Sequence, residues 1–118
     1  MKWWQIIVLI LVFVSCTDTT KVPDGIYPRE KMEAVLWDMM LADRFSAQFL
    51  LKDSAKLDVK LETMKMYNQV FKLNNTTHAE FVKSYKYYLN RPDLTKTIFD
   101  SLASRANKNR DELYKYLK

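Results

Sequence analysis

The chain of 118 residues is long enough for one domain with a modest core. Its single glycine and three prolines allow too few turns for an all-β fold, whereas its many Leu, Met, Lys, Ala and Glu residues favour helices. The formal net charge of +5 is only mildly basic, which is weak evidence for a nucleic-acid partner. We therefore expect an all-α protein that does not bind nucleic acid.

The N-terminus has the pattern of a secretion signal. Lys2 is followed by an apolar run from Trp3 to Val14 that only Gln5 interrupts. As a helix this run would span about 18 Å, well short of the ~30 Å hydrocarbon core of a membrane. Its length is typical of a signal peptide over residues 1–15, and a short membrane anchor is the alternative.

Cys16, the single cysteine, follows this run. The sequence Val14-Ser15-Cys16 resembles a lipobox, the site where bacterial signal peptidase II cuts before a lipid-modified cysteine, and Phe13 departs from the usual leucine. A lone cysteine in a secreted chain needs an explanation, which a lipid supplies. An ordinary secretion signal with an accidental cysteine is the alternative. We expect a lipid anchor at Cys16, a flexible tether over residues 16–27 and one domain over residues 28–118.

Four helical segments are expected in this domain, arranged as a small bundle or array. In each segment, apolar residues recur at steps of three and four, as one face of a helix requires. The segments cover residues 28–51, 55–73, 78–89, and 92 to near the C-terminus. Their apolar positions are Met32, Val35, Leu36, Met39, Ala42, Phe45, Phe49, Leu57, Leu61, Met64, Tyr67, Phe71, Phe81, Tyr85, Tyr88, Leu94, Ile98, Leu102, Leu113 and Leu117.

Local signals mark several helix ends. Thr77 and Glu80 have the spacing of a capping box, in which each side chain satisfies a backbone donor of the other residue. Asn75 tolerates the left-handed conformation that ends a helix. The apolar stripe of the fourth segment is interrupted near residues 106–107, where we expect a bend.

Three stretches resemble the family known as domain of unknown function 4296, whose members are small lipoproteins of Bacteroidota. They are PREKM at residues 28–32, LWDMMLAD at residues 36–43 and EFVKSYKYYLNRP at residues 80–92. The likeness covers roughly residues 22–104, and Asp43 stands where glutamate is common. The resemblance implies an envelope lipoprotein without an established activity. In such bacteria, acidic residues after the lipidated cysteine favour surface display, and only Asp18 precedes Lys21. We therefore expect the outer membrane, facing the periplasm.

The sequence lacks the usual catalytic constellations. His78 is the lone histidine, and a zinc site normally takes three or four ligands. Asp38 and Asp43 lie five residues apart on one helix, which separates them around its axis and makes them a poor acid–base pair. Phosphate-binding and hydrolase motifs are also absent. We expect no enzyme activity, no metal and no cofactor.

The candidates for partner binding are aromatic and acidic side chains, Trp37, Asp38, Asp43, Tyr85 and Tyr88. All of them except Trp37 also have a structural interpretation. Asp43 lies near the apolar stripe and could pair with a lysine, arginine or tyrosine hydroxyl of another helix. Tyr85 and Tyr88, among Lys83 and Lys86, could stack on sugars or bases, but their helical spacing fits core positions more simply.

Thr19 and Ser54 lie in short Asp-Ser/Thr patterns that resemble O-glycosylation sites of these bacteria, and Ser54 could equally cap a helix. Taken together, these features predict a membrane-anchored, non-enzymatic lipoprotein that binds or scaffolds another envelope protein. A carbohydrate- or peptidoglycan-binding lipoprotein is the alternative, and a hydrolase that uses carboxylates alone ranks third.

Overall fold

The computed structural model describes residues 21–50, 52, 55 and 58–117. The expected signal peptide, Cys16, Thr19 and Ser54 lie outside these residues. The described part is all-α, as expected, and contains no strand. Its elements are α2 (Arg29–Phe45), a π-helical segment η1 (Ser46–Leu50), α3 (Val59–Leu73), α4 (His78–Leu89) and α5 (Pro92–Tyr116).

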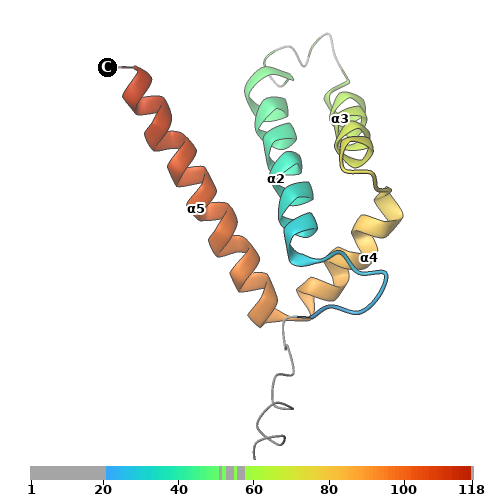
Figure 1. Cartoon of the computed structure of the whole chain (residues 1–118). Helices are drawn as coiled ribbons and strands as arrows, with labels where there is room; N and C mark the ends of the chain where they lie inside the picture. Colours follow the sequence, from blue (N-terminus) through green and yellow to red (C-terminus); the bar gives the residue numbers. More distant parts are fainter. Residues whose placement is uncertain (1–20, 51, 53–54, 56–57, 118) are drawn as a thin grey trace, which may run out of the picture.

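Helix α2 lies between α3 on one side and α5 on the other, and α4 joins the lower ends of α3 and α5 (Figure 1). This arrangement follows from two short links, because only four residues separate α3 from α4 and two separate α4 from α5. All four helices contribute to one core. Its buried members are Tyr27, Met32, Val35, Trp37, Val70, Phe71, Phe81, Tyr88, Ile98 and Leu102.

The local signals for helix ends are confirmed. The Thr77 hydroxyl accepts from the Glu80 backbone N–H at 3.3 Å, and the Glu80 carboxylate accepts from the Thr77 N–H at 3.0 Å. Asn75, which follows the C-cap Asn74 of α3, has φ of +50°. The second helix starts at Val59 and not at residue 55, because the Asp58 carboxylate caps it by accepting from the Leu61 N–H at 3.1 Å.

The folded domain begins before Pro28, so the expected tether over residues 16–27 is too long at its C-terminal end. Residues 23–26 form a turn in which the Ile26 N–H donates to the Pro23 carbonyl at 3.2 Å, and Gly25 has φ of +81°. Tyr27 is then buried in the core. A stretch this short has no helical period, so the apolar pattern could not place it.

The first and fourth helices differ from expectation in opposite ways. The first, expected over residues 28–51, ends at Phe45 and changes to the π-helical geometry of η1, where the Ser46 hydroxyl lies 2.9 Å from the Thr63 hydroxyl of α3. The fourth, expected to bend near residues 106–107, continues as an α-helix to Tyr116. Figure 1 shows α5 diverging from α2 toward its C-terminus.

Candidate functional site

A groove of about 440 Å³ lies between α2 and the C-terminal half of α5. It forms because the two helices are in contact near the base of the molecule and separate toward the C-terminus of α5 (Figure 1). Residues of α2 make one wall and residues of α5 the other. The lining residues are Trp37, Leu41, Arg44, Ala106, Asn107, Asn109, Arg110 and Leu113.

Two interhelical contacts hold α2 and α5 together, one below the groove and one at Trp37, which lines it. The Ser101 hydroxyl of α5 donates to the Glu33 carboxylate of α2 at 2.9 Å, and Arg29 pairs with the same carboxylate at 2.7 Å. One helical turn higher, the Arg105 guanidinium lies 4.2 Å from the centre of the Trp37 ring, a cation–π contact. Glu33 and Trp37 share a face of α2 because they are four residues apart.

The walls of the groove expose large apolar side chains. Leu41 is 46 % exposed and Leu113 is 62 % exposed. Further along the chain, the exposed rings of Phe45, at the end of α2, and Phe49 of η1 lie 4.9 Å apart between centroids. Contiguous apolar side chains that remain open to solvent are typical of interaction sites.

The charged residues that line the groove are both basic. Arg44 has no ion-pair partner within the described residues, and Arg110 lies 3.6 Å from Asp111 in an exposed pair, which solvent screens strongly. The lining contains no carboxylate. The groove therefore combines apolar walls with a basic rim.

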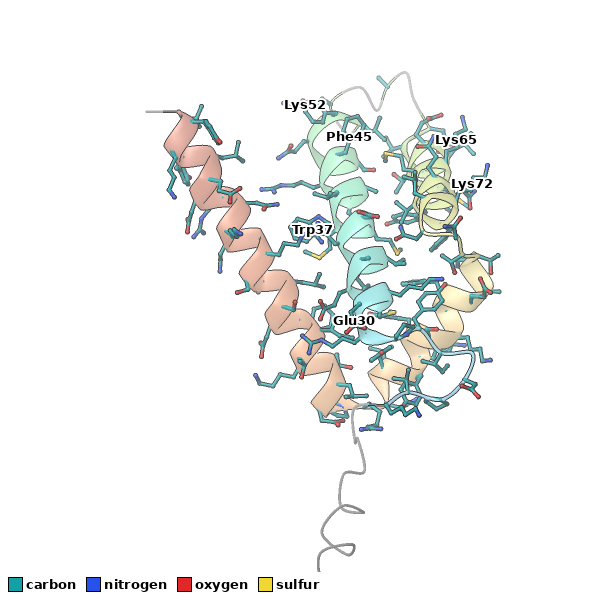
Figure 2. All side chains as sticks on the ribbon, in the orientation of Figure 1. Glu30, Trp37, Phe45, Lys52, Lys65 and Lys72 are labelled. Carbon is teal, nitrogen blue, oxygen red and sulfur yellow. The ribbon has the colours of Figure 1, made fainter. Side chains whose placement is uncertain are left out.

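Trp37, a candidate for partner binding, is only 7 % exposed. Figure 2 shows its side chain between α2 and α5. Trp37 lies at the closed end of the groove, where Arg105 covers the ring. Trp37 is therefore mainly a structural residue, which the sequence pattern did not predict.

Asp38 and Asp43 contact α3, not α5. The Asn74 side-chain amide donates to the Asp38 carboxylate at 2.9 Å, and the Tyr67 hydroxyl donates to Asp43. The expectation that Asp43 pairs with a group on another helix, a tyrosine hydroxyl among them, is confirmed. The hydrogen bond to Asp43, with a smaller effect of burial, raises the pKa of Tyr67 to about 12. Both carboxylates therefore connect two helices.

Tyr88 and Tyr85 pack within the molecule. The Tyr88 side chain is buried and its hydroxyl donates to the Tyr27 carbonyl at 2.8 Å. Burial raises the pKa of this hydroxyl. Tyr85 is half-buried and stacks on Phe81, with ring centroids 5.6 Å apart and an interplanar angle of 16°. The Tyr88 ring is therefore not a free platform for a sugar, and Phe81 covers one face of the Tyr85 ring.

A second hollow of about 450 Å³ lies at the base, where the chain enters the domain. It is lined by Lys21, Val22, Pro28, Arg29, Glu30, Tyr88, Leu94 and Thr97. Its charged side chains are of both signs, and Arg29 is already paired with Glu33. Across the described ranges, no group of histidine, cysteine or acidic residues could hold a metal ion.

The groove residues Leu41, Arg44, Arg110 and Leu113 were not expected to form a site. Leu113 belongs to the same apolar stripe as Leu102, and this stripe predicts a core position for both. The one sequence feature that could have indicated the groove is the gap in the apolar stripe between Leu102 and Leu113. It indicates where α5 leaves α2, although the helix itself continues.

The family model described as "Domain of unknown function (DUF4296)" matches residues 23–112. The match covers most of the chain, so the chain belongs to this family. No curated protein and no solved structure matches it. Among the helices that the structure describes, none is both long and apolar enough to cross a membrane.

Proposed function

We propose that this member of the DUF4296 family is a membrane-anchored lipoprotein of the bacterial envelope that binds another envelope protein and has no enzymatic activity. The groove between α2 and α5 is the observation that carries the proposal. It leaves Leu41 and Leu113 open to solvent, and a stable monomer gains nothing from exposing such side chains along two neighbouring helices.

The position of the groove suits a protein anchored at Cys16. Cys16 precedes Lys21 by five residues, a stretch of at most ~18 Å when fully extended. Lys21 lies at the base of the domain. The helices α2 and α5, whose residues line the groove, separate toward the opposite end (Figure 1). A lipid at Cys16 would hold the base near the membrane and point the groove away from it, into the periplasm if the anchor lies in the outer membrane.

Protein binding is favoured over carbohydrate binding by the surroundings of Tyr85 and Tyr88, the two tyrosines expected as binding candidates. Sugar recognition by stacking needs an open aromatic face. The Tyr88 ring is buried and one face of Tyr85 is covered by Phe81. Tyr114 and Tyr116, at the end of α5, are exposed, but neither lines the groove. The exposed rings of Phe45 and Phe49 lack a hydroxyl for hydrogen bonding to sugar.

The test is purification of the full-length protein from crosslinked cell envelopes through a tag after Lys118. We expect one membrane or periplasmic protein in a fixed ratio to the bait. The control is Cys16→Ala, which should lose this protein if lipid anchoring brings the two together. Recovery of glycan without protein would instead support the carbohydrate alternative, and turnover of an envelope substrate would contradict the absence of enzyme activity.

A further inference from the structure

We infer that the groove between α2 and α5 binds an acidic amphipathic helix of a partner protein. The inference rests on the proposed function and adds to it the location of the site and the chemistry of the partner segment. Three features of the groove carry it: its walls, its charge and the composition of α5.

The walls suit a helix because they are themselves two helices that separate. Leu41 of α2 and Leu113 of α5 line the groove from opposite sides. A third helix laid between them would cover both leucines and extend the packing of α2 against α5 beyond Ala106. Helices that bind in this way place apolar side chains at i, i+3, i+4 and i+7 along the contact face.

The charge of the rim selects an acidic partner. Arg44 stands on one wall without an ion-pair partner within the described residues, and Arg110 stands on the other wall in a loose exposed pair with Asp111. Carboxylates beside the apolar face of the bound helix would meet both guanidinium groups. Arginine is well suited to such contacts because its planar donors match a carboxylate.

A second copy of this chain is a poorer occupant. Its free C-terminal half of α5 is the helical segment available for insertion. Residues 108–115 of that segment contain three basic and two acidic side chains, so insertion would bring net positive charge against Arg44 and Arg110. Like charges at an interface oppose association.

The experiment is site-specific photocrosslinking in cells that make the full-length protein. A photoreactive phenylalanine analogue replaces Leu41 or Leu113 in the groove, or Leu73 as the control. Leu73 is an apolar residue of α3 that is 78 % exposed and does not line the groove. The crosslinked peptides are sequenced by mass spectrometry. We expect both groove positions, and not Leu73, to capture a segment with helical apolar spacing and several carboxylates.

Charge reversal tests the role of the rim. Arg44→Glu and Arg110→Glu should each lower the crosslinking yield at Leu41 and Leu113 by about tenfold, whereas Arg44→Lys should keep most of it. The control Lys72→Glu changes an exposed charge on α3 (Figure 2) and should leave the yield unchanged. Unaltered circular dichroism of each variant shows that the fold is retained.

The outcomes separate the inference from the proposed function. Capture at Leu73 but not in the groove would overturn the inference and leave a protein-binding function standing. Capture of a basic or extended segment, or of this same chain, would overturn it as well. Capture of no protein at any of the three positions would count against both.

Discussion

Tyr27 joins the segment before α2 to helix α4 through its backbone. Its N–H donates to the Ser84 hydroxyl at 2.9 Å, and its carbonyl accepts from the Tyr88 hydroxyl at 2.8 Å. Its own hydroxyl is hydrogen-bonded to Thr76, before α4. Buried backbone groups need such partners, because an unpaired one loses its bond to water without replacement. Ser84, which is fully buried on α4, therefore has a structural role. The apolar pattern of the sequence could not predict this role, because serine is a polar residue.

Replacing Ser84 tests this role. Ser84→Ala would leave the buried Tyr27 N–H without an acceptor, so we expect the free energy of unfolding to fall by about 1–3 kcal/mol. Denaturant titration followed by circular dichroism measures it. Ser104→Ala, an exposed position of α5, is the matched control and should change stability by less than about 0.5 kcal/mol. Equal effects of the two substitutions would contradict the proposed role.

Because of the hydrogen bond from Tyr67 to Asp43, the free energy of unfolding should depend on pH in the alkaline range. The pKa of Tyr67 is raised from 10.0 to about 12 in the folded protein. The folded state therefore holds this proton more tightly than the unfolded state. Its contribution to stability is complete below pH 10 and is lost as the pH rises through about 12.

Tyr67→Phe should therefore flatten the decline in stability between pH 10 and pH 12. Burial also raises the pKa values of Tyr27 and Tyr88, so a part of the decline will remain. Denaturant titrations at several pH values from 9 to 12 measure the slope, and Tyr114→Phe, at an exposed position, should leave it unchanged. A Tyr67→Phe variant with the wild-type slope would argue against this linkage.

At the scale of elements, α4 depends on the capping box at its start. Thr77→Ala removes the acceptor of the Glu80 N–H, so we expect a loss of about 1 kcal/mol in the free energy of unfolding. Thr97→Ala is the control, since the Thr97 hydroxyl donates to the Asp93 carbonyl within an exposed turn of α5, and it should have little effect. Thermal unfolding at neutral pH compares the two. A loss confined to Thr97→Ala would contradict the importance of the cap.

The two halves of α5 should respond differently to the loss of a large side chain. Ile98 is 1 % exposed, so Ile98→Ala opens a cavity and should cost about 2–5 kcal/mol. Leu113 is among the exposed groove residues, and Leu113→Ala should cost less than about 0.5 kcal/mol. Denaturant unfolding of both variants makes the comparison. A large cost at Leu113 would mean that the groove is closed in solution.

The same contrast explains how far the sequence could predict the fold. The signals that act within a few residues were reliable: the third helix was expected over residues 78–89, and α4 has these bounds. The apolar stripe that includes Leu102 and Leu113 was also correctly placed on one face of a helix. The period of a stripe does not give the angle at which two helices cross, so it could not distinguish the buried Leu102 from the exposed Leu113.

The candidate site was predicted less well for the same reason. Asp43 was expected to pair with a group on another helix, because a carboxylate beside an apolar stripe needs a partner, and Tyr67 is that partner. Trp37 was a candidate for partner binding, yet it is covered by Arg105 from sixty-eight residues further along the chain. A contact between residues so distant in sequence depends on the packing of whole helices, and no local pattern encodes it.

At the scale of the whole molecule, the anchor and the groove lie at opposite ends of the domain in the proposed function, so the two can be tested separately. Cys16→Ala removes the sulfur that would carry diacylglycerol. Signal peptidase II acts on the lipid-modified cysteine, so we expect an uncut precursor without lipid. The domain should still fold, because its core begins at Tyr27. The remaining attachment would come from the apolar run of residues 3–14, a weaker anchor than several acyl chains.

Mass spectrometry of the N-terminal peptide decides this prediction. In the wild-type protein we expect a chain that begins at Cys16 and carries acyl groups, and in Cys16→Ala an intact N-terminus with neither change. Thermal unfolding of the two proteins should agree within about 0.5 kcal/mol, the range of substitutions outside a core. An unmodified Cys16, or cleavage at another bond, would remove the lipid anchor from the proposed function. The groove would keep its apolar walls and basic rim in that case, because none of its residues depends on Cys16.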